Sequence, residues 1–239
     1  MTIQYDARAI TASSSQTANI DYGGRSSPSV SHASAGPAGL YRYGPKRAFD
    51  ATIICMAAPF IVMTIALLAL ALMLEGGNPF YTQTRVGLNG KFFRMWKFRT
   101  MVVGADAKLE AYLADNPKAR KEWDTTQKLK RDPRITRIGR TLRKTSLDEL
   151  PQLWNVLIGD MSLVGPRPMM PSQQNLYPGS AYYRLRPGIT GSWQVSKRNE
   201  SSFAERADYD QDYFIMLSLS NDVRILIKTV RVVVRGTGY

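Results

Sequence analysis

The apolar positions of the chain fall into three patterns along its length. Residues 51–74 form an apolar run without a single charged side chain. Residues 1–43 are dominated by Ser, Ala, Gly and Thr and have no period at which apolar positions repeat, which predicts a disordered tail. Residues 76–239 mix apolar and polar positions and have the size of one domain. We therefore expect a tail, a membrane-embedded segment over residues 44–75 and a globular domain.

The apolar run is long enough to cross a membrane. As a straight helix it measures about 36 Å, against about 30 Å for a hydrocarbon core, so a single spanning helix is one interpretation. Pro59 lies inside the run and predicts a kink or a break. Positive charge stays on the cytoplasmic side. Basic residues flank the run on both sides, namely Arg42, Lys46 and Arg47 before it and Arg85, Lys91, Arg94, Lys97 and Arg99 after it. A re-entrant helix broken at Pro59, which enters and leaves by the same face, removes that conflict.

Shorter patterns predict elements of the globular domain. Residues 80–85 and 91–98 flank Asn89-Gly90, a dipeptide that favours a type I′ turn, so we expect a β-hairpin. Residues 105–115 are expected to form a helix. The fold class that we expect is mixed α/β and mainly helical, with a small globular domain that contains the hairpin.

Two segments have the pattern of basic amphipathic helices. One covers residues 128–144, and the other lies near the C-terminus. Such a stripe is also typical of a solvated face or of a helix docked on nucleic acid. We favour contact with anionic lipids at the membrane interface, and no nucleic acid, because a membrane segment lies nearby and no known nucleic-acid-binding signature is present. The stripes consist of Arg134, Arg137, Arg140 and Arg143, and of Arg224, Lys228, Arg231 and Arg235.

Composition narrows the chemistry. The chain has 32 Lys and Arg against 19 Asp and Glu, a net charge of +13, which indicates a polyanionic partner. Its one cysteine and one histidine exclude zinc sites of the Cys/His type and triads built on histidine. Any chemistry must therefore use carboxylates, basic groups and hydroxyls.

Asp148 and Glu149 are the candidate reactive carboxylates. Ser146 with Glu149 three positions later also fits a capping box, in which these side chains only begin a helix. In the functional interpretation, helix amides keep Asp148 ionised, so that it can attack phosphorus or hold Mg²⁺. Neighbouring Arg143 and Lys144 are placed to neutralise phosphate oxygens. Adjacent helical positions point about 100° apart, so the two carboxylates cannot face each other as in a glycoside hydrolase.

Further cations lie in restricted backbone. Arg167 stands between Pro166 and Pro168, an arrangement that suits a rigid bidentate contact to phosphate but also a merely stiff loop. Arg186 precedes a similar Pro-Gly turn. Lys97 and Arg99 are expected on one face of a strand, because side chains alternate along it. Together with the carboxylate pair these cations indicate a site for a nucleotide diphosphate.

Four motifs give the chain a family resemblance. They are residues 97–101 (KFRTM), 146–153 (SLDELPQL), 159–168 (GDMSLVGPRP) and 186–191 (RPGITG). In this order and spacing the chain, from about residue 46 to its end, resembles the bacterial sugar transferases. These are the monotopic phosphoglycosyl transferases that start exopolysaccharide synthesis on undecaprenyl phosphate.

The resemblance implies an activity and roles for single residues. Asp148 would attack the sugar-linked phosphate of a UDP-sugar, releasing UMP, and undecaprenyl phosphate would then take the phosphosugar. Glu149 would assist with Mg²⁺ or with proton transfer. Contacts to phosphate or uridine are implied for a set of cations, and membrane anchoring for residues around the apolar run. The first set is Lys97, Arg99, Arg143, Arg167 and Arg186, and the second is Lys46, Arg47, Asp50 and Pro59.

The resemblance also implies a location, the cytoplasmic face of a bacterial inner membrane. A homo-oligomer and contacts with other polysaccharide-assembly proteins are compatible with it. The sugar is left open between galactose and glucose. One departure concerns the membrane helix, since Ala58 precedes Pro59 where several relatives place Ser.

Two other functions stay open at this point. One is a membrane-tethered basic binding module, in which Asp148 and Glu149 cap a helix and nothing is catalysed. The other is a glycosyl transferase that releases UDP rather than UMP.

Overall fold

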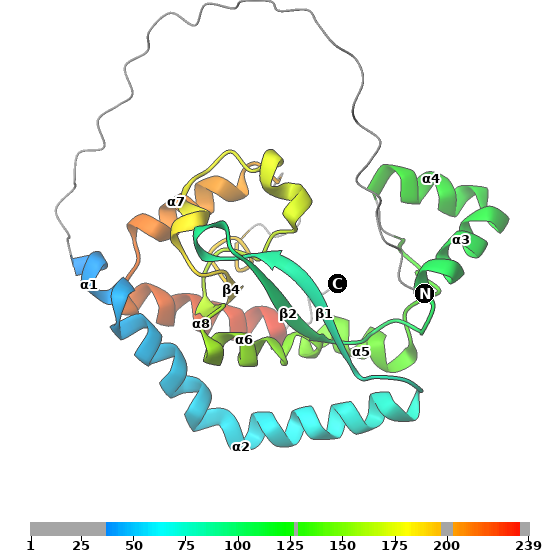
Figure 1. Cartoon of the computed structure of the whole chain (residues 1–239), viewed down its shortest axis with the longest axis horizontal. Coiled ribbons are helices and arrows are strands. Elements are labelled where there is room, and N and C mark those ends of the chain that lie inside the picture. Colours follow the sequence, from blue (N-terminus) through cyan, green and yellow to red (C-terminus); the bar gives the residue numbers. More distant parts are fainter. Residues whose placement is uncertain (1–36, 127–128, 197–202, 235–239) are drawn as a thin grey trace, which may run out of the picture. The chain divides into compact units, whose positions relative to one another are not determined.

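The computed structural model describes residues 37–126, 129–196 and 203–234 (Figure 1). The described part of the chain contains eight α-helices, four strands and four short 3-10 helices. The α-helices and strands position the site. In chain order these are α1 Pro37–Tyr43, α2 Pro45–Leu74, β1 Phe80–Val86, β2 Phe92–Phe98, α3 Ala105–Asp115, α4 Pro117–Thr126, α5 Arg137–Thr145, α6 Gln152–Ile158, β3 Ser162–Val164, β4 Gly188–Thr190, α7 Arg206–Ile215 and α8 Leu219–Val234. The mixed and mainly helical fold that we expected is confirmed.

Helix α2 carries the apolar run and is, within the described residues, the one helix long and apolar enough to cross a membrane. Only 11% of its most apolar stretch is buried inside the protein, so most of this apolar surface faces outward. The helix continues through Pro59, so a break there is wrong, whereas the kink that was the other expected outcome remains. It bends along its length in Figure 1, as a proline that displaces the preceding turn predicts. Thr64, further along, donates to the Phe60 carbonyl oxygen at 2.8 Å.

The predicted hairpin is confirmed. Strands β1 and β2 pair antiparallel, with Phe80 opposite Phe98 and Val86 opposite Phe92. At the turn, Asn89 and Gly90 both have positive φ, 57° and 75°, and the Lys91 amide donates to the Leu88 carbonyl at 3.2 Å. Two consecutive positive φ values define a type I′ turn, whose twist matches that of the strands.

A second sheet brings two of the sequence motifs into contact. Strands β3 and β4 are parallel neighbours, and Gly165 donates to the Thr190 carbonyl at 2.8 Å. A Cβ atom at Gly165 or Gly188 would collide with the backbone of the other segment. Both glycines are therefore required by the close approach of the two motifs, and Arg167 and Arg186 emerge from this junction.

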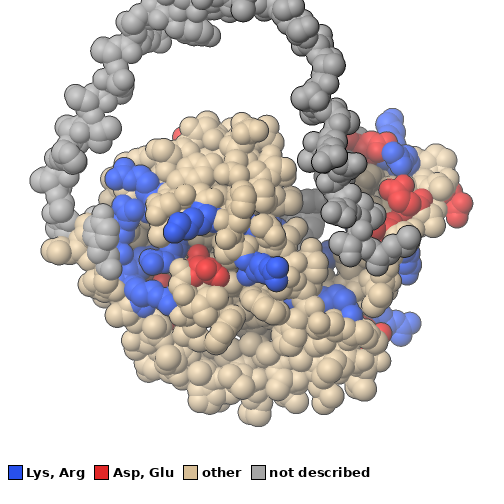
Figure 2. Space-filling model, in the orientation of Figure 1, with Lys and Arg blue, Asp and Glu red and all other residues tan. Residues whose placement is uncertain are grey.

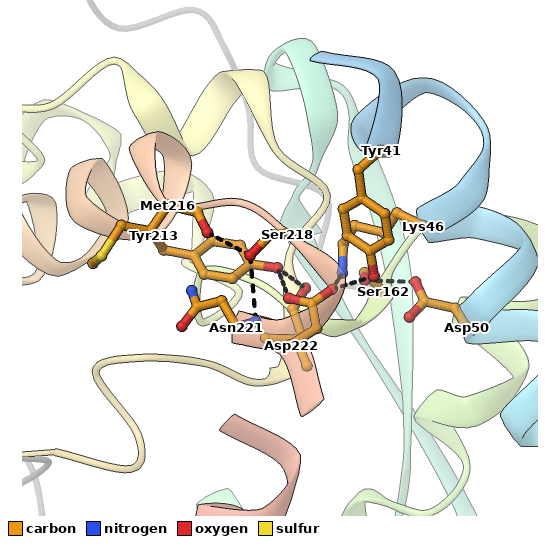
Figure 3. Close-up of polar contacts among 10 residues, drawn as sticks. Tyr41, Lys46, Asp50, Ser162, Tyr213, Met216, Ser218, Asn221 and Asp222 are labelled. Carbon is orange, nitrogen blue, oxygen red and sulfur yellow. Dashed lines mark hydrogen bonds and ion pairs between the residues drawn. The ribbon is translucent and has the colours of Figure 1, made fainter. Parts of the chain in front are cut away.

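A buried polar network connects the start of α2 with β3, α7 and α8 (Figure 3). Asp222 lies at its centre with no exposed surface and accepts from Lys46 at 2.6 Å and from Tyr213 at 2.7 Å. Tyr41 donates to the same carboxylate at 2.9 Å. On the α2 side, Ser162 donates to Asp50 at 2.6 Å. Lys46 and Asp50, expected to anchor the membrane segment, thus fasten it to the globular domain.

The first predicted basic helix is shorter than expected. Only Arg137–Thr145 is helical, because Thr136 begins α5 by accepting from the Gly139 amide at 2.9 Å. Asp132 precedes Pro133, whose ring disfavours helix before it. Arg134 lies outside the helix and forms a buried ion pair with Asp132 at 2.7 Å. Of the segment predicted over residues 128–144, positions 129–136 are therefore loop, and position 128 lies outside the described residues.

Two other expectations have mixed outcomes. The helix over residues 105–115 is confirmed as α3, and the C-terminal basic helix as α8, although Arg235 lies outside the described residues. The tail predicted over residues 1–43 lies mostly outside them, but Pro37–Tyr43 form helix α1. The expectation of disorder is wrong for that stretch.

Candidate active site

Asp148 and Glu149 lie in a turn between α5 and α6. Ser146 ends α5 in a left-handed conformation, with φ of 57°, and its side chain caps no amide. Leu147–Glu149 then form one turn of 3-10 helix, and α6 begins only at Gln152. The capping-box interpretation is therefore wrong, and so is the placement of Asp148 at the N-terminus of an α-helix.

Lys97 on β2 reaches both carboxylates. Its Nζ atom lies 2.9 Å from Glu149 and 3.9 Å from Asp148, and all three side chains are at most 20% exposed. The strand is held against α6 by Asn155, which is fully buried. The Asn155 side chain accepts from the Trp96 amide at 3.0 Å and donates to the Arg94 carbonyl at 2.8 Å. The Asn155 side chain thus pairs with β2 as a neighbouring strand would, and these bonds hold the strand that carries Lys97 against α6.

Burial and neighbouring charges act on the pKa of Asp148 in different directions. Burial raises the pKa of Asp148 above its usual range, the Lys97 charge opposes this rise, the Glu149 charge adds to it, and Arg143 opposes it. Arg143 on α5 donates to the Thr100 hydroxyl at 2.8 Å, and burial lowers its own pKa. Cations are thus positioned where they stabilise the charged form of a partly desolvated carboxylate.

A cavity of about 260 Å³ lies beside this cluster, and we call it the cationic cavity. Lys97, Glu149 and Arg167 line it, together with Arg85 and Arg206. Four cations against one carboxylate make it a site for a polyanion. Phosphate groups are the natural ligands of such a set, because guanidinium groups bind their oxygens in pairs.

Arg85 and Arg206 were missed by the sequence reasoning. Arg85 lies on the same hairpin face as Lys97, because Tyr81 is opposite Lys97 and β1 positions alternate. The register of the hairpin was the signal that could have found it. Arg206 comes from α7, donates to the Arg167 carbonyl at 2.8 Å and stacks over Trp193. No local pattern connects α7 to the loop that it supports.

The structure does not bring every predicted cation to this cavity. Strand β2 ends at Phe98, so Arg99 leaves the face of Lys97 and donates to the Gly76 carbonyl instead. The expectation that both lie on one strand face is wrong. Arg186 donates to the Gly159 carbonyl at 2.9 Å and lines a different cavity.

That second basic cavity lies near the start of α2 and has a volume of about 310 Å³. Figure 2 shows Lys and Arg gathered on this side of the molecule. Arg47 donates to the carbonyls of Val156 and Leu157 at the end of α6, so it stabilises a helix C-terminus. The cavity is lined by five cations, namely Arg42, Lys46, Arg47, Arg184 and Arg186.

A divalent metal fits the carboxylate pair in a limited way. Within the described part of the chain, no group of three or more His, Cys, Asp or Glu residues converges on one point. Mg²⁺ does not require one, since it commonly binds one or two carboxylates, substrate phosphates and water. Asp148 and Glu149, next to the cationic cavity, offer that donor set.

Comparison with known proteins identifies the family to which these motifs belong. The sequence profile of the family described as "Bacterial sugar transferase" matches residues 41–236, which includes the carboxylate pair, the hairpin and the apolar helix. The chain belongs to the bacterial sugar transferase family. The resemblance of the four motifs is thereby confirmed.

Named relatives of the family cover most of the chain. It is 48% identical over 199 residues to the UDP-galactose-lipid carrier transferase of Erwinia amylovora, covering 81% of this chain and 41% of that protein. Its identity is 46% to the undecaprenyl-phosphate galactose phosphotransferase of Salmonella typhimurium, with the same coverage. It is 43% identical to the exopolysaccharide production protein ExoY of Sinorhizobium fredii, covering 81% of this chain and 87% of that protein. The chain thus spans less than half of the first two relatives and most of the third.

Proposed function

We propose that this bacterial sugar transferase moves a hexose 1-phosphate, from UDP-galactose or UDP-glucose, to undecaprenyl phosphate and releases UMP. The observation that carries the proposal is the contact of Lys97 with Asp148 and Glu149 at the edge of the cationic cavity. The relatives support it, because one is named as a phosphotransferase to undecaprenyl phosphate and another as a galactose-lipid carrier transferase.

In the first step, a carboxylate oxygen of Asp148 attacks the sugar-linked phosphorus. The bond from that phosphorus to the bridging oxygen breaks, UMP leaves with this oxygen, and a phosphosugar aspartyl anhydride remains. In the second step, a phosphate oxygen of the lipid attacks the same phosphorus. The Asp148 carboxylate leaves unchanged, and the product is a lipid diphosphosugar.

The surrounding cations support both steps. Each step brings two anions together, so Lys97 and Arg167, which line the cationic cavity, lower the barrier by stabilising the charge of the phosphate oxygens. Arg143 does not line that cavity and acts instead on the charge of Asp148. Glu149 is bound by Lys97 and lies beside the nucleophile, so it is placed to orient Lys97. We propose Asp148 and Glu149 as the residues that would hold Mg²⁺, which when bound supplies further neutralisation of phosphate charge.

Membrane association agrees with a lipid acceptor. Helix α2 exposes apolar side chains along its length, and α8 exposes apolar and basic side chains. We propose that α2 is re-entrant and that α8 lies in the interface on the cytoplasmic face of the inner membrane. A polyprenyl phosphate keeps its chain in the bilayer, so the active site must lie at headgroup depth.

The test is the nucleotide released by the detergent-solubilised full chain with Mg²⁺, undecaprenyl phosphate and each UDP-sugar in turn. We expect UMP, no UMP from Asp148→Asn, and normal UMP from Asp106→Asn, which changes an exposed carboxylate on α3. Without lipid, the wild type should release one equivalent of UMP and gain the mass of the phosphosugar, and Asp148→Asn should do neither. Release of UDP would indicate ordinary glycosyl transfer, and UMP release by Asp148→Asn would reject the covalent mechanism.

The binding module is tested in the same preparations. It predicts salt-sensitive binding to anionic vesicles that survives Asp148→Asn, with no nucleotide release from any sugar tried.

A further inference from the structure

A third cavity, distinct from the cationic cavity and from the basic cavity near the start of α2, adjoins the active site. We call it the apolar cavity. It has a volume of about 230 Å³ and shares Glu149, Arg167 and Ile189 with the cationic cavity. Leu147 and Glu149, the two neighbours of Asp148, both line it. Apolar side chains dominate the rest of its wall, namely Leu150, Leu153, Val195, Val232 and Val233.

The outer wall of the apolar cavity is the last turn of α8. Val233 lines the cavity and is 44% exposed, so the wall is continuous with the surface of the protein. That surface is itself apolar. One face of α8 exposes Leu219, Val223, Ile227, Val230 and Val233, at the spacing of three and four residues that places side chains on the same side of a helix.

The same helix carries Arg224, Lys228 and Arg231. A helix with an exposed apolar face and basic residues beside it is typical of the membrane interface. The apolar cavity therefore extends from a membrane-facing surface to the carboxylate and guanidinium groups of the active site.

Its two ends match an amphiphile. A lipid phosphate has a hydrocarbon chain at one end and an anion at the other, and the cavity has apolar walls at one end and Arg167 at the other. Four hydroxyl side chains also line the cavity, namely Thr145, Ser146, Thr190 and Thr229, but most of the lining surface is apolar. A hexose would therefore leave several of its hydroxyl groups without partners there, which is costly. The nucleotide diphosphate is better placed in the cationic cavity.

A buried amide supports this assignment. Gln194 is 8% exposed and lines the apolar cavity, and neither polar atom of its side chain has a hydrogen-bond partner in the part of the chain that the structure describes. An unsatisfied buried donor is costly. A phosphate oxygen of a bound lipid would accept from Gln194 Nε2 and remove that cost.

We propose that the apolar cavity is the acceptor site, in which the first part of the polyprenyl chain lies against Val232 and Val233 of α8 and its phosphate faces Gln194 and Arg167. The inference rests on the proposed function and adds where the lipid enters. The rest of the polyprenyl chain stays in the bilayer, so the lipid passes along α8 between the membrane and Asp148.

The test is a substitution in the outer wall that places a larger side chain in the apolar cavity. Val233→Trp should raise the KM for undecaprenyl phosphate by about tenfold or more, equivalent to about 1.4 kcal/mol of binding. The KM for the UDP-sugar, and the burst of UMP released without lipid, should stay unchanged. Val230→Trp is the matched control, because Val230 is exposed on the same helix and does not line the cavity. Gln194→Met should also raise the KM for the lipid while the burst persists.

Other results would overturn the inference. A higher KM for the UDP-sugar in Val233→Trp would place the nucleotide in this cavity. Equal effects of Val233→Trp and Val230→Trp would indicate general membrane docking by α8. Failure of the proposed function is distinguishable from both, since the wild type would then release no UMP.

Discussion

The Lys46 ammonium lies 2.6 Å from the Asp222 carboxylate, in a buried ion pair that joins the first turn of α2 to the first turn of α8. Both side chains are almost fully removed from solvent, and Tyr41 and Tyr213 complete the hydrogen bonding of Asp222. The two helices with the largest exposed apolar surfaces are thus held in one arrangement by a polar contact (Figure 3).

We predict that Asp222→Asn destabilises the protein by about 3–5 kcal/mol, because it removes the hydrogen-bonded counter-ion of the buried Lys46 charge. The measurement is chemical denaturation in detergent. Asp124→Asn is the control, because its pair with Arg120 is more than half exposed and should contribute less than about 1 kcal/mol. Equal losses of unfolding free energy in the two variants would show that the buried pair stabilises the protein no more than the exposed pair does.

Lys97 should set the acid limit of activity. Its charge opposes the rise in the pKa of Asp148 that burial causes, and the nucleophile must be ionised. We therefore expect Lys97→Met to move the acid limb of kcat/KM for UMP release to higher pH, whereas Lys97→Arg, which keeps the charge, should leave it nearly in place. An unmoved limb in Lys97→Met would mean that Asp148 is not the group that titrates.

Asp210 should give the stability a pH dependence of its own. Burial raises the pKa of Asp210 to about 6, although Tyr177 and Arg206 oppose the rise. The native state therefore keeps a proton that the unfolded chain has lost, and this stabilisation is complete below pH 4 and lost as the pH rises through 6. Relative to Asp210→Asn, the wild type should lose up to about 3 kcal/mol between about pH 4 and pH 7. A constant difference in unfolding free energy across that range would contradict the assignment.

The bend at Pro59 should decide the topology of α2. If the helix is re-entrant, cysteines introduced at exposed Gly44 and Lys91, in a Cys55→Ser background, will react with an impermeant maleimide from the same side of the membrane. We expect Pro59→Leu, which restores the backbone donor, to favour a straighter helix. The contacts of Lys46 and Asp50 with the globular domain oppose this change, so only a fraction of the molecules should move one site to the opposite side. Opposite-side labelling in the unaltered helix would reject the re-entrant arrangement.

Local patterns predicted the local elements well. Asn89-Gly90 specified a turn that needs two positive φ values, and the apolar run of α2 needs no tertiary partner to be recognised. The errors arose where a non-periodic feature competes with periodicity. Basic residues recur every third position from Arg134 onward, yet Pro133 and the Thr136 cap delay the helix to Arg137.

The candidate site was predictable in its residue types and less so in its geometry. Asp148, Glu149, Lys97 and Arg167 converge as the motifs suggested. Arg186 lies elsewhere because its place depends on the end of α6, which no local pattern reveals. Gln194 escaped notice for a similar reason, since an amide attracts attention only when burial leaves it without a partner.

Two hydrogen bonds of the Asn155 side chain join α6 to strand β2 of the hairpin. Its amide pairs with the Trp96 amide and the Arg94 carbonyl as a third strand would, so α6 and the strand that carries Lys97 cannot separate without breaking both hydrogen bonds. In the mechanism that we propose, the nucleotide would therefore be exchanged for the lipid beside a Lys97 whose strand stays attached to α6. On that mechanism, the parts that would have to move are the cavity walls contributed by α8 and by the loop around Arg167.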